Sequence, residues 1–205
     1  RVYWNQGELW HKDKSEGWKD MEWMIRDWVN WRWLSGDHIV EQHIHNIDVA
    51  NWFKDAHPVK AVGSGGRARR PTGDQYDYFA VDFEYADGTH VASYCRQVNG
   101  CANSVDEFMI GTKGHTHTTS GRAEIFGANQ WKYRRSREGS FVSPYVQEHM
   151  DLIAAIRKGE PINETKRIAE STLTAIMGRE AAYSGDTIVW DKILKSDMKL
   201  GPESM

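Results

Sequence analysis

Apolar and polar residues alternate through the middle of the chain. The segment "YDYFAVDFEYADGTHVASYCRQVNG" predicts two half-buried strands joined at Asp87-Gly88, a dipeptide typical of tight hairpins. The segment "SVDEFMIGTKGHTHTT" repeats the pattern with a turn at "GTKG", and "RAEIFG" and "QWKYRR" predict two further short strands. We therefore expect a run of antiparallel strands between residues 76 and 135.

Helical spacing of apolar residues flanks this run of strands. Residues 37–54 predict a helix that Asp37 caps, with Val40, Ile44 and Ile47 on one face. Later, "SPYVQEHMDLIAAIRKGE" and "NETKRIAESTLTAIMGREAAYSGD" predict two longer helices, "WDKILKSD" predicts a short one, and "RVYWN" opens the chain as a strand. Hairpin-joined strands without β-α-β alternation indicate an α+β fold with helices on one sheet face.

Composition narrows the classes of function. A net charge of -3 over 205 residues gives no electrostatic case for nucleic acid or an anionic membrane, and no apolar run is long enough to span a bilayer. Strand-like residues follow Arg1 at once, so we expect a fragment; a cytoplasmic or periplasmic location stays open. Cys95 and Cys101 are expected to be free, because both lie in or beside one predicted strand.

Tryptophan is concentrated near the start of the chain. Seven of the ten tryptophans fall in the first 33 residues. Residues 6–35 are polar and weakly periodic, with "DMEWMIRDW" as a short predicted helix. Such a long aromatic segment is either a cap over a site or a surface that packs on a partner.

The stretch "SGDHIVEQHIHNIDVANW" concentrates histidine. On a regular helix Glu41 and His45 are neighbours at i, i+4, and His38 lies one turn before Glu41. These three residues suit general acid–base chemistry, a zinc site, or a solvent-facing stripe without function. His43 falls on the apolar side of the helix, where we expect a buried, hydrogen-bonded histidine.

Two other motifs predict no site. "GSGGRARR" looks like a phosphate loop, but a dinucleotide fingerprint needs a helix opening from it, and Pro71 follows instead. In "GHTHTTSG" the alternation puts His115 and His117 on one face of a strand. We expect an exposed edge strand there rather than a metal pair.

Four segments together resemble the C-terminal domain of the glucose–fructose oxidoreductase / inositol dehydrogenase (Gfo/Idh/MocA) family: "GDHIVEQHIHNIDVANW", "FAVDFEYADGTHV", "FMIGTKG" and "NETKRIAESTLTAIMGREAAYSGDTIVWDKIL". The resemblance implies an open mixed, mostly antiparallel sheet with helices on one face, like the C-terminal domains of dihydrodipicolinate reductase and glyceraldehyde-3-phosphate dehydrogenase. Residues 1–205 would then form a single domain that binds a small carbohydrate and makes a homo-oligomer through the open sheet face. The N-terminal domain that binds NAD or NADP would be missing, so this chain alone is expected to bind no cofactor and to be inactive.

The resemblance also implies roles for particular residues. The family's Asp-x-x-x-His motif matches Glu41 and His45, with histidine as the catalytic acid–base and the carboxylate beside it. The substrate contacts that we infer from the resemblance, the helix and the aromatic segment are His38, Trp4, Asn5, Trp33 and Asn103. Two departures stand out: glutamate replaces the aspartate, and His43 stands where many members have a small residue.

These departures keep alternatives open beside a sugar or polyol oxidoreductase. One is a lyase or glycosidase that retains NAD and oxidises the sugar transiently, with a metal at Glu41, His43 and His45 if the helix is distorted. Another is a binding domain without catalysis.

Overall fold

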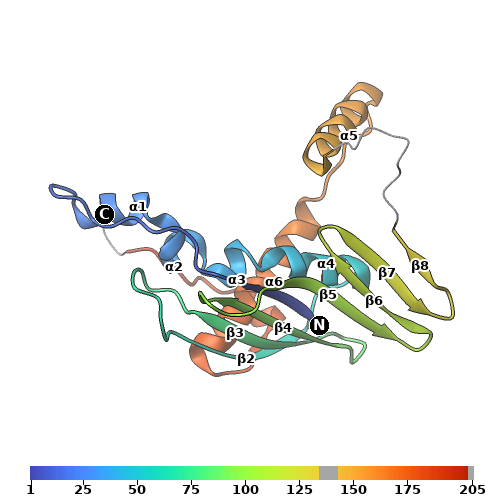
Figure 1. Cartoon of the computed structure of the whole chain (residues 1–205), viewed down its shortest axis with the longest axis horizontal. Helices are drawn as coiled ribbons and strands as arrows, with labels where there is room; N and C mark the ends of the chain where they lie inside the picture. Colours follow the sequence, from blue (N-terminus) through green and yellow to red (C-terminus); the bar gives the residue numbers. More distant parts are fainter. Residues whose placement is uncertain (134–142, 203–205) are drawn as a thin grey trace.

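A nine-stranded mixed sheet forms the centre of the computed structural model, which describes residues 1–133 and 143–202 (Figure 1). The strand order is β8-β7-β6-β5-β1-β4-β3-β2-β9. The strands are β1 (Val2–Gln6), β2 (Lys60–Gly66), β3 (Tyr78–Glu84), β4 (His90–Gln97), β5 (Ser104–Gly111), β6 (Gly114–Thr119), β7 (Arg122–Gly127), β8 (Trp131–Lys132) and β9 (Ile188–Val189). Strand β1 runs parallel to β4, and the other pairs between described strands are antiparallel.

The helices confirm the predicted α+β class. They are α1 (Asp20–Arg26), the 3₁₀ helix η1 (Trp28–Asn30), α2 (Arg32–Ser35), α3 (His38–Glu41), α4 (Ile44–Lys54), α5 (Pro144–Lys158), α6 (Thr165–Ser184) and α7 (Trp190–Ile193). Helix α4 packs on β1 and β5, and α6 packs on β2 and β3, so both cover one side of the sheet. Within the described ranges, no helix has the length and apolar character needed to cross a membrane.

The core lies between these helices and the sheet. Alternation along β3 buries Phe79, Val81 and Phe83 beneath them. Helix α6 comes close because Gly178 has no side chain: a Cβ there would lie 2.7 Å from Cζ of Phe83. Tight packing at this point fixes the distance between α6 and the sheet.

Most predicted turns and ends are confirmed. Asp87-Gly88 joins β3 to β4, "GTKG" joins β5 to β6, and α5 ends at Gly159 with a left-handed backbone. Both cysteines are free. The predicted edge strand with His115 and His117 is wrong, because β6 lies between β5 and β7. Arg134 and Arg135 of "QWKYRR" lie outside the described residues.

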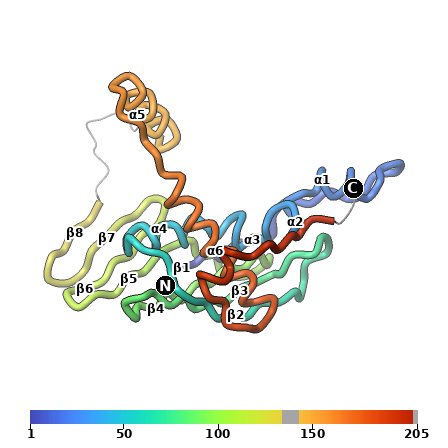
Figure 2. Tube along the Cα trace, turned by 180° about the vertical axis from the view of Figure 1, so that it is seen from behind, coloured from blue at the N-terminus to red at the C-terminus, as the bar shows by residue number. Residues whose placement is uncertain are grey.

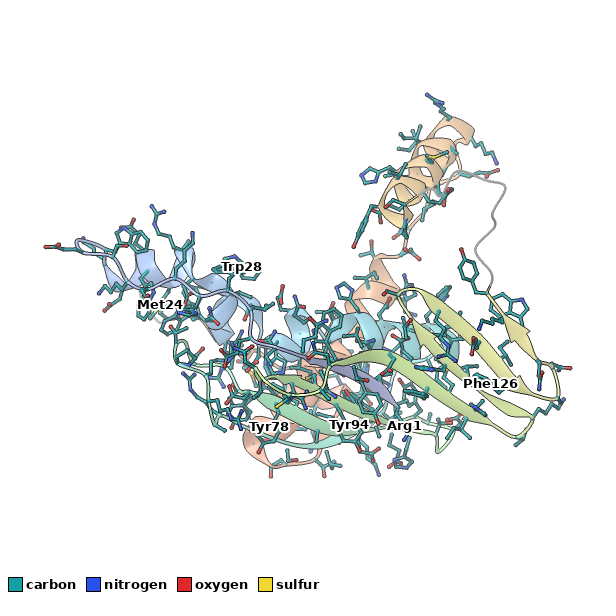
Figure 3. All side chains as sticks on the ribbon, in the orientation of Figure 1. Arg1, Met24, Trp28, Tyr78, Tyr94 and Phe126 are labelled. Carbon is teal, nitrogen blue, oxygen red and sulfur yellow. The ribbon has the colours of Figure 1, made fainter. Side chains whose placement is uncertain are left out.

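The other face of the sheet carries a band of aromatic side chains. Tyr3 stacks on Tyr94 with ring centres 5.5 Å apart and meets Phe108 edge-on. Phe108 in turn stacks on His117, and farther along the sheet His115 stacks on Phe126. Figure 3 labels Tyr78, Tyr94 and Phe126 along this sheet. We call this surface, defined by Tyr3, Tyr78, Tyr94, Phe108, His115, His117 and Phe126, the open face.

Two segments extend from the sheet. Helix α5 stands apart from the sheet in both views and has no buried residue (Figures 1 and 2). The Trp-rich segment extends on the opposite side, and the described end of the chain returns beside it (Figure 2). A Cβ at Gly201 would lie 3.9 Å from the Trp33 ring, so the described end of the chain packs beside the Trp-rich segment.

Candidate functional site

His45 is an exposed imidazole placed against the first strand. It belongs to the first turn of α4, and its ring centre lies 5.7 Å from that of Trp4 in β1. Alternation along β1 turns Trp4 toward the helices together with Val2, which is buried in the core. The result is a solvent-accessible acid–base group beside an indole face.

The predicted continuous helix over residues 37–54 is wrong at its centre. The carbonyl oxygen of His38 accepts hydrogen bonds from the amides of both Gln42 and His43, each at 3.0 Å, so the chain makes one wide turn. Helix α3 ends at Glu41 and α4 begins at Ile44. A wide turn of this kind rotates the side chains after it relative to those before it, so the i, i+4 relation of a regular helix does not apply across it.

Glu41 keeps part of its carboxylate free within the fold. Its Oε2 is buried and has no hydrogen-bond partner among the described residues. A carboxylate oxygen in this state favours a partner that can donate a proton or a hydrogen bond. Together, Glu41 and His45 offer an acceptor and an acid–base on consecutive helical segments.

His38 is not at the rim of a pocket, which corrects the expected substrate contact. It is 1% exposed, and its ring meets Phe79 edge-on at 5.0 Å. Asp37 caps α3 with a positive φ of 76° and accepts hydrogen bonds from the His38 amide and from the Tyr183 hydroxyl. Burial opposes the charged carboxylate of Asp37, but the hydrogen bonds from His38, Tyr183 and the Tyr76 amide outweigh it and lower its pKa.

His43 is buried, as its place on the apolar side predicts. Its Nε2 lies 2.7 Å from Oγ of Ser93 in β4. Burial, and secondarily the charge of nearby His38, lower the pKa of His43 to about 3, so the ring is neutral in the physiological range. The alternative of a metal at Glu41, His43 and His45 finds no support: no three His, Cys, Asp or Glu side chains in the described parts of the chain gather as a metal-binding group.

The remaining predicted contacts are dispersed. Asn5 follows Trp4 and therefore points to the open face, where it lines a hollow with Tyr3 and Tyr94. Asn103 is exposed in the loop just before β5, and Ser104 after it pairs with Asn5. Trp33 is half-buried beside the end of the chain. The structure brings Trp4 and His45 together, but Asn5 faces the other side of the sheet.

The Trp-rich segment packs largely on itself. Trp23 meets Trp31 edge-on at 5.2 Å, and Trp10 meets Trp28 at 6.4 Å. Met24 and Trp28 lie on the projecting part of this segment (Figure 3). Mutual packing accounts for part of the tryptophan excess without a partner.

A buried polar network anchors this segment to the sheet. The Asn30 side chain donates to Asp27 and accepts from the guanidinium of Arg70, and Arg70 also donates to Gln97 of β4 at 2.5 Å. All four side chains are nearly inaccessible to solvent. Because a buried ion or amide is costly without partners, this network fixes the place of the segment.

The loop that resembles a phosphate loop surrounds a carboxylate of the protein itself. Backbone amides of Ala68, Arg69 and Arg70 all donate to Oδ2 of Asp77, which is fully buried. Successive amides that point to one place form an anion site, and here Asp77 occupies it. The prediction that "GSGGRARR" is no nucleotide site agrees with this arrangement.

The sequence did not predict the hydrogen-bond partners of His43 and Asn46. Ser93 is a buried serine, and the buried Glu107 of β5 accepts from the Asn46 amide at 2.5 Å. A small polar residue at an inward position of an alternating strand, as in "VASYC", was the available sign.

Comparison with known proteins identifies related chains. The family model described as GFO/IDH/MocA C-terminal domain matches residues 11–131. Similar solved structures include UDP-N-acetylglucosamine 3-dehydrogenase from Acidithiobacillus ferrooxidans, at 14% identity and a TM-score of 0.65 over 89% of this chain and 52% of that one. Aldose-aldose oxidoreductase from Caulobacter crescentus, complexed with glycerol, has 16% identity and a TM-score of 0.65 over 92% and 54%.

Levoglucosan dehydrogenase in complex with NADH and levoglucosan is similar too, with 14% identity and a TM-score of 0.64 over 92% of this chain and 58% of that one. At these identities the structures share the fold. The chain spans only 52%, 54% and 58% of the lengths of these three proteins. Among curated proteins, none matches the chain.

Proposed function

Because the chain belongs to the GFO/IDH/MocA C-terminal domain family, we propose that it is the substrate-binding and oligomerisation domain of an NAD(P)-dependent oxidoreductase acting on a sugar or polyol. The observation that carries this proposal is the exposed His45 imidazole beside the Trp4 ring. Two similar structures are named as oxidoreductases of sugars, and a third is a dehydrogenase in complex with NADH and levoglucosan. These names support the same class of enzyme. The parent protein would carry its cofactor in a second, N-terminal domain.

In this proposal His45 accepts the hydroxyl proton of the substrate. Oxidation of an alcohol to a carbonyl moves that proton to an imidazole nitrogen and the carbon-bound hydrogen, as hydride, to the cofactor. When bound, the nicotinamide supplies the hydride acceptor. The Trp4 ring offers an apolar face to the C–H groups of a sugar. Glu41, at the end of α3, remains the proposed carboxylate partner of His45. Trp33 and Asn103 remain proposed contacts at the margin of the site.

The decisive experiment is reduction of NAD or NADP by the full-length parent with a panel of sugars and polyols. His45→Ala should lower kcat by about 100-fold or more, because general-base catalysis contributes that much. His149→Ala, which changes an exposed histidine of α5, is the matched control. Unchanged sugar oxidation by His45→Ala would refute the role of His45.

The same assay separates the alternatives. A dehydrogenase accumulates reduced cofactor in proportion to oxidised sugar. A redox-cycling lyase or glycosidase instead forms an eliminated or cleaved sugar while its bound cofactor returns to the oxidised state. A binding domain without catalysis gives neither product, although calorimetry detects sugar binding.

The open face supports a proposed homo-oligomer. Neither α4 nor α6 covers the open face. The side chains of Tyr78, Tyr94 and the neighbouring Val62 are therefore 40–46% exposed to solvent. An apolar sheet surface of this kind is typical of a subunit interface. A second copy of the chain, related by twofold symmetry, would present the same aromatic side chains to it.

A further inference from the structure

The wide turn between α3 and α4 determines where His45 stands. We propose that His43 is a positioning residue: its hydrogen bond to Ser93 holds this turn against the sheet and thereby sets the place of His45 against Trp4. The inference rests on the acid–base role proposed for His45. His43 is fully buried and does not contact any group that we propose to react, so its role would be to position His45.

The first step is the place of Ser93 in the sheet. Strand β1 pairs with β4 so that Val2 lies opposite Ser93 and Trp4 lies opposite Cys95. The hydrogen bond of 2.7 Å from His43 to Ser93 therefore reaches the sheet two residues away from the Trp4 position. Strand β4 therefore helps to place both groups: the start of α4 through the His43–Ser93 hydrogen bond, and Trp4 through the pairing of β1 with β4.

The second step is a matching bond on the other side of β1. The Asn46 amide donates to Glu107 of β5 at 2.5 Å, and the hydroxyl of Thr118 in β6 donates to the other carboxylate oxygen. Strand β1 lies between β4 and β5. The first turn of α4 is thus hydrogen-bonded to both neighbours of β1, and His45 lies between the two anchoring residues in sequence.

The third step is that this arrangement is rigid. His43, Asn46, Ser93 and Glu107 are each at most 8% exposed. Buried hydrogen bonds of this kind are costly to break, since the group left behind loses its partner in a low-dielectric interior. Burial also keeps the His43 ring neutral, because its pKa is lowered to about 3. His43 is therefore a fixed support and exchanges no proton at neutral pH.

The test compares three variants with a matched control in the protein. His43→Ala removes the ring, Ser93→Ala removes only its hydrogen-bond partner, and His43→Gln keeps an amide that can reach Ser93. The control, Tyr85→Phe, removes a buried hydrogen bond of 2.5 Å to Asn51 near the other end of α4. Ser93→Ala deletes one oxygen atom, so it tests the inference even if His43→Ala does not fold.

The readout is the proton NMR spectrum of the His45 ring. The Trp4 ring current shifts the His45 resonances, so they report the distance between the two rings. We expect His43→Ala and Ser93→Ala to move these resonances, His43→Gln to restore much of the wild-type position, and Tyr85→Phe to leave them unchanged. Wild-type His45 resonances in a folded Ser93→Ala protein would overturn the inference.

The second test measures kcat and KM of the same variants in the full-length parent. Ser93→Ala and His43→Ala should lower kcat by about 10- to 100-fold, the cost of a misplacement of about 1 Å, with KM changed by less than about 3-fold. An inactive wild-type parent would refute the proposed function, while the NMR result would still decide the positioning inference. An active parent with unchanged kcat in the variants would overturn the inference alone.

Discussion

His43 shows how one residue can be structural and still matter for chemistry. The neutral imidazole has a serine partner at Nε2, while its Nδ1 is buried without a partner among the described residues, and a charged ring would also lose its hydration. Proton binding to this ring is therefore coupled to unfolding. The coupling has a definite direction and a definite pH range.

We predict that the protein loses stability on acidification in part through His43. Its pKa is lowered from 6.5 to about 3, so between these values the unfolded chain binds a proton that the folded protein does not. The free energy of unfolding should fall as pH falls through this window, by at most about 1.4 kcal/mol per pH unit from this group. Urea denaturation at several pH values should show a shallower loss for His43→Gln than for wild type. Parallel pH profiles for the two proteins would contradict the prediction.

The residues of the candidate site could be predicted only in part. The helical wheel correctly placed His43 on the buried side, because it lies beside Ile39 and Ile47 in any helix that covers a sheet. It misplaced His38, since the wheel assumes an unbroken helix and this one widens at Gln42 and His43. That turn depends on contacts with β4 and β5, which lie 50 and 61 residues from His43 and Asn46 in sequence. Local spacing carries no information about such partners.

At the scale of elements, the contact between α6 and the sheet depends on an absent side chain. Gly178 sits in the middle of a 20-residue helix, where alanine would normally be preferred. Phe83 and Ile39 occupy the space that a methyl group would need. Packing and helix propensity therefore favour opposite outcomes at this position.

We predict that packing decides the outcome. Gly178→Ala should destabilise the protein by about 1–2 kcal/mol, because overpacking costs about 1–3 kcal/mol and the gain in helix propensity is at most about 1 kcal/mol. The change can be measured by chemical denaturation. Lys166→Ala, at an exposed position of the same helix, is the control and should be nearly neutral. A stabilised Gly178→Ala protein would mean that Phe83 can move aside.

Elements with clear periodicity and clear turn residues were predictable from the sequence, and irregular loops were not. The β3–β4 hairpin follows from alternation and Asp87-Gly88, and α5 and α6 follow from apolar spacing. The loop around Asp77 could not be read from "GSGGRARR", because its amides bind a carboxylate that follows several residues later in the chain. The same glycine-rich composition suits an external phosphate or an internal aspartate.

For the whole molecule, the proposed homo-oligomer places the open face at the subunit interface. We predict that Tyr94→Glu weakens the proposed homo-oligomer, since it places a charge among Tyr3 and its stacked neighbours. The dissociation constant, measured by analytical ultracentrifugation, should rise by at least about 10-fold. Trp52→Glu, at an exposed position of α4 on the other side, is the control. Equal association of wild type and Tyr94→Glu would exclude the open face as the interface.

The placement of β1 has a consequence for how the chain folds. Strands β4 and β5 are separated by only six residues, 98–103, yet they do not pair, because β1 lies between them. A β4–β5 hairpin is quick to form, whereas the native pairs need a loop of about 90 residues to close. We therefore expect a local, non-native β4–β5 hairpin to compete with the native pairing, and to open before β1 is inserted. During synthesis β1 leaves the ribosome before β4 and β5, so its native pairing waits until those two strands have been made.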